Sequence, residues 1–263
     1  MPEGPEIKRA ADKIAKAISQ QPITELFFAF DRLKRFEETL AAATVIAVEP
    51  RGKALLTRFD NHLNIYSHNQ LYGVWMVRKV QSYPQTNRQL RLAIHTAKKS
   101  ALLYSASDIE VLTDYECDHH PFLRRIGPDV LNPATTVEQV AQRLMEKRFY
   151  RRRLTTLLLD QQFLSGLGNY LRSEILFAAG IHPSLRPVDC TAAQLQQLAE
   201  TGGSTNDLAR VAQLKAQGLR RSQYRFYVFS RAARACYQCG TSIIKEQIGG
   251  RRCYYCPNCQ PRP

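Results

Sequence analysis

The sequence predicts a multidomain protein of the α+β class, with a β-rich amino-terminal region, a helical middle region and a small cysteine-rich module at the carboxyl end. Three observations support this prediction. Short β-prone runs fill residues 22–112, amphipathic helical patterns follow residue 136, and five of the seven cysteines lie within residues 236–259. A chain of 263 residues, 44% of them hydrophobic, fits one large domain or two ordinary ones plus a small module.

The first predicted element is a helix over residues 5–19. Apolar residues such as Ile7, Ala11 and Ile14 recur at the spacing of a single helical stripe. Pro5 suits the first helical position, because the N–H that proline lacks has no partner there in any case.

The next region is predicted to consist of strands. Its β-prone runs are separated by polar turn residues and cover residues 23–30, 44–49, 54–59, 63–67, 74–80, 90–95 and 102–104. Many short strands with polar turns are typical of a sandwich or a barrel, and the pattern alone leaves both open.

Helical patterns follow a boundary rich in proline and glycine at residues 126–133. Helices are predicted over residues 137–144, 154–163 and 170–179, the last ended by Gly180. Thr191 and Gln194 have the spacing of a capping box that opens a further helix.

The last predicted features before the cysteine module are a break and a strand. Residues 201–204 have the composition of a flexible break, and residues 224–229 that of a strand. We therefore expect three domains, at residues 1–127, 128–222 and 223–263.

The net charge favours a polyanionic partner. Lysine and arginine total 37 against 23 acidic residues, which gives +14, and a field of that sign suits nucleic acid or an anionic membrane. From Arg220 onward there are nine basic residues and one acid, so 9 − 1 = +8 of this charge lies near the carboxyl end. No apolar run approaches the ~20 residues that cross a bilayer, and no signal peptide is evident. We expect a cytoplasmic protein that binds nucleic acid, without a membrane partner.

Four cysteines have the spacing of a zinc site. Cys236 and Cys239 form one CxxC pair, and Cys256 and Cys259 form a second one sixteen residues later. Each pair places two thiolates on one turn, and two pairs complete a tetrahedral site. Cys253 with Cys256 is also a CxxC pair, but Pro257 favours the turn between Cys256 and Cys259.

The amino terminus carries a candidate nucleophile. Removal of the initiator methionine would make Pro2 a free secondary amine, which is partly neutral near pH 7 and is able to attack a sugar C1′ to give an iminium ion. Glu3 and Glu6 place carboxylates nearby for proton transfer. The alternative is that these acids merely suit the start of a helix.

Several motifs together resemble one family. They are Met-Pro-Glu-Gly-Pro-Glu at residues 1–6, Arg51-Gly-Lys53 before a strand, Gly166-Leu-Gly-Asn169-Tyr, and the terminal Cys-Pro-x-Cys-Gln. The chain is identified on them as a member of the Fpg/Nei family of DNA glycosylases, and the resemblance extends from the first residue to the last cysteine pair. Residues 69–73, Asn-Gln-Leu-Tyr-Gly, resemble the endonuclease VIII branch, which acts on oxidised pyrimidines.

The resemblance implies a fold and an activity. The fold would comprise an amino-terminal helix with a β-sandwich, a helix-two-turn-helix domain and a zinc-finger β-hairpin. The protein would be a monomer, bacterial and nucleoid-associated, that binds damaged double-stranded DNA, excises the altered base and cuts the strand by β,δ-elimination. One Zn²⁺ would be structural, because four thiolates leave no open coordination position.

The resemblance also implies a role for single residues. Pro2 would form the Schiff base, Glu3 would assist base loss, Lys53 would serve β-elimination and Arg251 would serve δ-elimination. The residues expected to contact DNA are Gln70, Leu71, Tyr72, Arg125 and Asn169, and Leu71 and Tyr72 offer a wedge for the gap that a flipped base leaves.

Three features depart from the family pattern. Residues 200–222 do not match it, Arg252 and Cys253 stand where apolar residues are usual, and the tail after Gln260 is unlike it. Arg252 is therefore a possible substitute for Arg251. Two other hypotheses stay open, namely a zinc-finger protein that binds DNA without catalysis, and an enzyme of the same kind that acts on oxidised purines.

Overall fold

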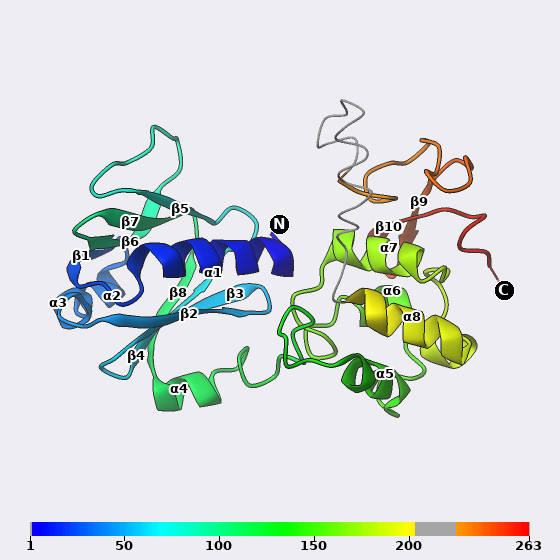
Figure 1. The fold of residues 1–263 in the computed structure, drawn as a ribbon, viewed down its shortest axis with the longest axis horizontal. Coiled ribbons are helices and arrows are strands. Elements are labelled where there is room, and N and C mark those ends of the chain that lie inside the picture. Colours follow the sequence, from blue (N-terminus) through cyan, green and yellow to red (C-terminus); the bar gives the residue numbers. More distant parts are fainter. Residues whose placement is uncertain (1, 203–224, 263) are drawn as a thin grey trace. The chain divides into compact units, whose positions relative to one another are not determined.

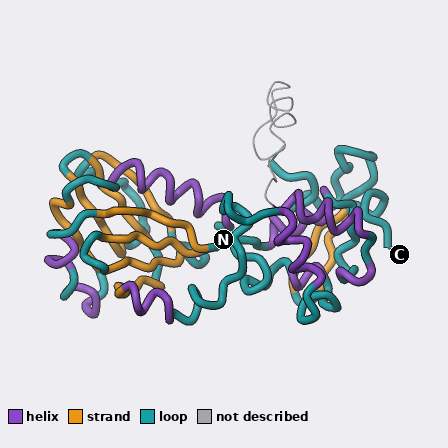
Figure 2. Tube along the Cα trace, turned by 60° about the horizontal axis from the view of Figure 1, so that its bottom comes forward, coloured by secondary structure: helices purple, strands orange, loops and turns teal. Residues whose placement is uncertain are grey.

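A computed structural model describes residues 2–202 and 225–262 (Figures 1 and 2). The chain divides into two compact units, residues 1–126 and residues 127–263. Among the described residues, no helix combines the length and the apolar character needed to span a bilayer. Residues 203–222, whose sequence departs from the family pattern, lie outside the described residues. Of the break predicted at residues 201–204, the first two residues are the end of a helix and the other two lie outside the described residues.

Two four-stranded antiparallel sheets form the first unit, so the sandwich is confirmed and the barrel is excluded (Figure 1). One sheet has the order β1-β6-β7-β5, with β1 Ile23–Phe28, β5 Val74–Lys79, β6 Leu90–Thr96 and β7 Lys99–Tyr104. The other has the order β2-β3-β4-β8, with β2 Val45–Arg51, β3 Ala54–Phe59, β4 Leu63–His68 and β8 Asp108–Thr113. Short helices α2 (Asp31–Lys34), α3 (Glu37–Ala41) and α4 (Asp114–His119) connect or follow these strands.

Helix α1 (Gly4–Ile18) completes the core of the sandwich. The apolar stripe predicted for this helix is buried, and Ile7 and Ile14 share one hydrophobic cluster with Leu55 of β3 and Ile94 of β6. Full burial of an aliphatic side chain contributes about 1.5–3 kcal/mol, so this stripe fixes α1 on the unit and thereby fixes the start of the chain.

The second unit begins as a helical assembly. Its helices are α5 Val137–Met145, α6 Leu154–Leu157, α7 Asn169–Ala178, the 3₁₀ turn η1 Pro187–Asp189 and α8 Ala192–Gly202. Thr191 and Gln194 form the predicted capping box, since each side chain bonds the backbone N–H of the other. Gly180, with φ of +63°, follows the end of α7 as predicted.

The cysteine module packs directly on α7. Its strands, β9 Ile244–Ile248 and β10 Arg251–Tyr255, form an antiparallel hairpin. Phe177 of α7 shares a hydrophobic cluster with Val228, Ile243 and Tyr254, and the buried Gln260 side chain donates to the Ile181 carbonyl at 2.8 Å. The tail after the last cysteine pair is thus part of the fold of this unit.

Two predicted elements are wrong. Residues 225–229 do not form the expected strand, because the carboxylate of Glu174 accepts the backbone N–H groups of Tyr227, Val228 and Phe229 that a strand would need. Tyr224 lies outside the described residues. The helix predicted over residues 154–163 ends at Leu157 and continues as turns.

Candidate active site and metal centre

The first residues of the chain are held by the start of α1. Pro2 is partly exposed, whereas Glu3 is only 3% exposed. The Glu3 carbonyl accepts the N–H groups of Glu6 and Ile7 at 3.0 and 3.1 Å, and the Glu3 N–H donates to Oε2 of Glu6 at 3.1 Å. The backbone that carries Pro2 and Glu3 is therefore ordered, and it stands at the positive end of the helix dipole.

Lys53 lies in the two-residue turn between β2 and β3. Gly52 has φ of +62° there, which glycine adopts without strain, and the pair of Arg51 with Ala54 closes the hairpin. Lys53 is only 9% exposed, which is unusual for a lysine. Figure 1 shows that α1 begins at the end of the sandwich where β2 turns into β3. The fold therefore brings Lys53 and the chain start to one end of this unit.

The loop that joins β4 to β5 projects an apolar tip. Leu71 and Tyr72 are 62% and 71% exposed. Gln70 has φ of +50°, and the Gly73 N–H donates to the Asn69 carbonyl at 2.7 Å. A Cβ on Gly73 would lie 2.5 Å from that carbonyl oxygen, so only glycine fits. The backbone turn thus holds both large side chains outward.

Two side chains brace this loop from other parts of the unit. Ser107 Oγ donates to Oε1 of Gln70 at 2.8 Å, and the Arg88 guanidinium donates to the Tyr72 carbonyl. Neither Ser107 nor Arg88 was identified from the sequence. Both contacts join residues that are far apart in the chain, and no local pattern indicates them.

His68 bonds the backbone of the exposed loop and interacts electrostatically with Lys53. It ends β4, opposite Ala54 of β3, and its Nδ1 accepts the Gln70 N–H at 3.1 Å. Burial lowers the pKa of His68; the positive charge of Lys53 lowers it further, against an opposing effect of Asp108. Sequence analysis missed His68, although its position directly before Asn69-Gln70 was an available signal.

Arg125 lies at the end of the first unit. It is exposed, and its Nε donates to the Pro121 carbonyl at 2.7 Å. This bond anchors the inner part of the guanidinium, and the side chain remains at the surface, where an anion is able to approach it.

In the second unit, Asn169 is the first residue of α7. Gly168 takes the N-cap position, so Asn169 does not itself cap the helix. Asn169 is partly exposed, and its Oδ1 accepts a hydrogen bond from Arg172 at 2.8 Å. The start of a helix presents backbone N–H groups that lack intrahelical acceptors, which suits an anion such as phosphate.

Arg251 and Arg252 directly follow the turn of the β9–β10 hairpin. Gly249 and Gly250 form this turn with φ of +60° and +77°, and Arg251 pairs with Ile248 to close it. Both arginines are exposed. The hairpin therefore presents two guanidinium groups close to its tip.

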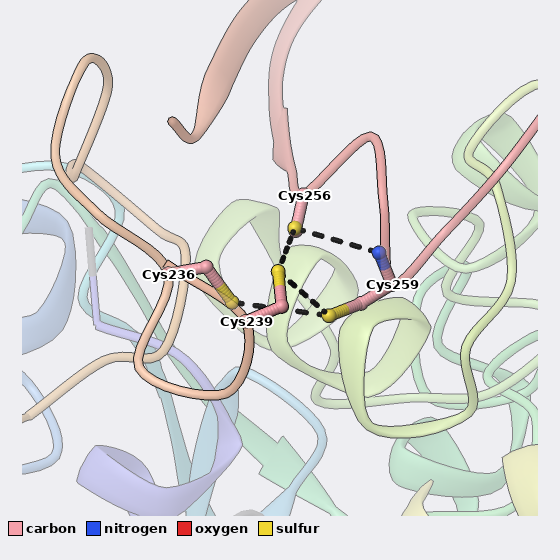
Figure 3. Close-up of side chains that lie close together, drawn as sticks. All are labelled: Cys236, Cys239, Cys256 and Cys259. Atoms are coloured by element: carbon pink, nitrogen blue, oxygen red, sulfur yellow. Dashed lines mark hydrogen bonds between the residues drawn. The ribbon is translucent and has the colours of Figure 1, made fainter. Parts of the chain in front are cut away.

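Four cysteines converge on one point in the second unit (Figure 3). The ligand atoms of Cys236, Cys239, Cys256 and Cys259 all lie within 4.8 Å of one another. The Sγ–Sγ distances are 3.4 Å for Cys239–Cys256, 3.5 Å for Cys239–Cys259 and 3.9 Å for Cys236–Cys259. Sulfurs at 2.3 Å from a tetrahedral zinc are separated by about 3.8 Å, so this cluster fits the ion. Cys253 is buried on β10 and is not a member of the cluster.

The thiols differ in how readily they lose a proton. Hydrogen bonds from Thr241 lower the pKa of Cys239 to about 6. Burial raises the pKa of Cys256 and Cys259. A bound cation favours the thiolate form of every ligand, so a metal would offset the cost of placing these sulfurs together.

Each unit thus carries one part of a possible chemistry. The first has a chain end beside the buried Glu3, a buried lysine and a protruding apolar loop. The second has a helix start, two exposed arginines and a metal-ligand cluster. Positive groups and amide donors suit a phosphate backbone, and an amine next to a carboxylate suits covalent attack with proton transfer.

Two family models match the chain. The one described as Formamidopyrimidine-DNA glycosylase N-terminal domain matches residues 1–107, and the one described as Formamidopyrimidine-DNA glycosylase H2TH domain matches residues 126–216. The chain is 49% identical over 262 residues to Endonuclease 8 of Escherichia coli O1:K1, covering 99% of this chain and 100% of that protein. It is 48% identical to Endonuclease 8 of E. coli strain UMN026, with the same coverage.

Solved structures share the fold. A complex of Lactococcus lactis Fpg with DNA that contains an abasic site matches with a TM-score of 0.79 at 20% identity, over 99% of this chain and 100% of that one. A complex of the same L. lactis protein with DNA that contains an oxidized pyrimidine matches with a TM-score of 0.79 at 19% identity and the same coverage. At this identity, the two matches establish the architecture alone.

Proposed function

Because the chain belongs to the formamidopyrimidine-DNA glycosylase (Fpg/Nei) family of base excision repair, we propose that it excises oxidised pyrimidines from double-stranded DNA and then cuts the strand. The observation that carries this proposal is its 49% identity to Endonuclease 8 over 99% of the chain. The exposed Leu71–Tyr72 tip, the buried Lys53 and the hydrogen bonds that hold Glu3 at the start of α1, all in the same unit, support it.

Base loss begins at the chain start. With Met1 removed, the Pro2 nitrogen attacks C1′ of the damaged nucleotide, the bond from C1′ to the base breaks, and the base leaves with a proton. Glu3 donates a proton to O4′ as the sugar ring opens, which leaves an iminium ion between C1′ and Pro2. The position of Glu3 supports this role, because it directly follows Pro2, is buried, and lies in backbone that hydrogen bonds hold at the start of α1.

Strand cleavage follows from the iminium ion, which acidifies the C2′ hydrogen. Loss of that proton breaks the C3′–O3′ bond, and loss of a second proton, from C4′, breaks the C5′–O5′ bond. Lys53 assists the first elimination and holds a neighbouring phosphate, and Arg251 assists the second. Water then hydrolyses the iminium ion and restores the Pro2 amine.

The protein must first expose the damaged base. Flipping a base out of the duplex costs a few kcal/mol, and Leu71 and Tyr72 offset this cost by filling the gap in the stack. Gln70, Arg125 and Asn169 contact the DNA. The hydrogen bonds that hold this loop support the role, because they keep both apolar side chains exposed at its tip.

Zinc is the metal that we assign to the cysteine cluster. Cys236, Cys239, Cys256 and Cys259 would hold it, and it would order the hairpin that carries Arg251. With four thiolate ligands the ion is structural and does not activate water.

Borohydride trapping tests the proposal against a zinc-finger protein that only binds DNA. Reduction in the presence of DNA with an abasic site should attach the protein covalently to the strand. A protein with a retained amino-terminal extension serves as the control, because it keeps the DNA contacts but lacks the free amine. Equal trapping of both forms, or of neither, would refute Pro2 as the nucleophile.

A second measurement addresses the substrate. Excision from duplexes that contain thymine glycol should exceed excision from otherwise identical duplexes that contain 8-oxoguanine. A clear preference for 8-oxoguanine would favour the hypothesis that this enzyme acts on oxidised purines.

A further inference from the structure

Arg172 of α7 is a charged residue in the interior of the second unit. It is 0% exposed, which is rare for arginine unless its donors are satisfied. Its Nη1 donates to the Thr155 carbonyl at 3.2 Å, and its Nη2 donates both to Oδ1 of Asn169 at 2.8 Å and to the Arg252 carbonyl at 2.6 Å. One guanidinium therefore joins α6, the start of α7 and β10.

The bond to Asn169 determines which way that carboxamide faces. A guanidinium offers only donors, so the oxygen of Asn169 must face Arg172, and the NH₂ group is then directed away from it. Phosphate oxygens only accept hydrogen bonds. The orientation that Arg172 imposes is the one in which the partly exposed Asn169 is able to donate to DNA.

The bond to the Arg252 carbonyl likewise holds the backbone of the hairpin in place. The carbonyl that accepts it belongs to the second residue after the Gly249–Gly250 turn, next to Arg251. Since Nη2 carries two protons, the same nitrogen serves both Asn169 and the hairpin backbone. A displacement of Arg172 would therefore disturb both DNA-binding elements of this unit together.

We propose that Arg172 is a positioning residue for DNA binding: it fixes the Asn169 carboxamide as a donor and sets the hairpin arginines relative to it. Because it is wholly buried, Arg172 acts through Asn169 and the hairpin and does not touch DNA itself. This inference rests on the proposed function, in which Asn169 contacts the DNA and Arg251 assists the second elimination.

A double-mutant cycle tests the coupling. The variants are Asn169→Ala, Arg172→Lys and their combination, and the affinity is measured on a duplex that carries a tetrahydrofuran abasic-site analogue. Hydrogen bonds to charged groups are worth about 1.5–3 kcal/mol, so each single substitution should weaken binding by about tenfold or more. If Arg172 acts through Asn169, the combined loss is clearly smaller than the product of the two single losses.

Arg143→Lys is the matched control. Arg143 also donates to backbone carbonyls of this unit, at Phe163 and Gln162, but it bonds neither Asn169 nor the hairpin in the described contacts. The losses of DNA affinity caused by Arg143→Lys and by Asn169→Ala should multiply in the combined variant, as expected for independent sites. Coupling as strong for Arg143 as for Arg172 would indicate a general loss of packing and would overturn the proposal.

Asn169→Asp tests the donor orientation without altering Arg172. An aspartate keeps the bond to Arg172 and suits the start of a helix, so the thermal stability should be maintained. It presents a carboxylate to the phosphate, however, and binding should fall below that of Asn169→Ala. Binding by the aspartate variant equal to or better than that of the alanine variant would overturn the proposed orientation.

The outcomes distinguish a failure of this inference from a failure of the proposed function on which it rests. If Asn169→Ala binds DNA as well as the unaltered protein, the DNA contact assigned to Asn169 is wrong, and the inference falls with it. If Asn169→Ala weakens binding but the losses for Arg172 and Asn169 multiply, the proposed function stands and only the positioning role of Arg172 is refuted. Zinc content and melting temperature, measured for each variant, identify any that fail to fold. If Arg172→Lys is among them, the comparison of Asn169→Asp with Asn169→Ala decides whether the Asn169 carboxamide has the proposed orientation.

Discussion

Oε1 of Glu174 lies 2.9 Å from the backbone nitrogen of Val228 and accepts its N–H. The same carboxylate accepts the N–H groups of Tyr227 at 2.6 Å and Phe229 at 2.9 Å. A helix side chain thus satisfies three successive N–H groups of the segment that leads into the cysteine module. This contact joins the module to α7.

Glu174→Gln should destabilise the second unit. A glutamine side chain has one oxygen and an NH₂ group, so at least one buried N–H loses its acceptor, at a cost of about 1–3 kcal/mol. Chemical denaturation measures the difference. Glu200→Gln, at an exposed position of α8, is the control and should change the stability by less than about 0.5 kcal/mol. Equal stability of both variants would contradict the role of Glu174.

The hairpin turn makes a second prediction, about Gly249. A Cβ at this position would lie 2.9 Å from Oγ1 of Thr156, whereas a Cβ on Gly250 meets nothing within 4 Å. Both glycines have positive φ, which costs about 1–2 kcal/mol for another residue. Gly249→Ala should therefore destabilise the protein more than Gly250→Ala, and Thr156→Ala should remove part of the difference. Identical melting temperatures for the two glycine variants would show that the turn does not approach α6 this closely.

The cysteine cluster makes a third prediction. Cys256→Ala should release zinc and weaken DNA binding, because three thiolates leave the site incomplete. Cys253→Ala should retain the metal, because Cys253 lies outside the cluster. Elemental analysis of the purified variants measures the zinc content. Retention of zinc by the Cys256 variant would assign the site to other ligands.

The exposed loop makes a fourth prediction. Leu71→Ala should leave the stability unchanged, because the side chain is 62% exposed, but it should slow base excision from duplex DNA about tenfold, since less of the cost of flipping is offset. Strand cleavage at a preformed abasic site should be less affected, because no base has to be flipped. Val188→Ala, at an apolar residue of the other unit that is also exposed, should leave both rates unchanged. Equal losses at both kinds of site would argue against a wedge.

Local patterns predicted much of the fold. The stripe of α1, the turn at Gly180 and the capping box at Thr191 each depend on residues within a few positions of one another. The order of the strands in the two sheets does not, because β5 pairs with β7 and β4 with β8 across long segments of chain. Sequence spacing alone therefore left the sandwich and the barrel both open.

The site shows the same limit. The spacing of Cys256, Pro257 and Cys259 favoured the pair that the structure brings together with Cys236 and Cys239. By contrast, no sequence pattern singled out Arg172 or Glu174 within the predicted helix. Their roles depend on acceptors and donors at Arg252 and Val228, more than fifty positions away, and no local pattern reveals such contacts.

The mass of the borohydride-trapped adduct after proteolysis tests the central claim most directly. The account predicts that the deoxyribose fragment is attached to the peptide that begins at Pro2, with Met1 removed. Attachment to a lysine side chain such as that of Lys53, or fully active protein that retains Met1, would contradict it.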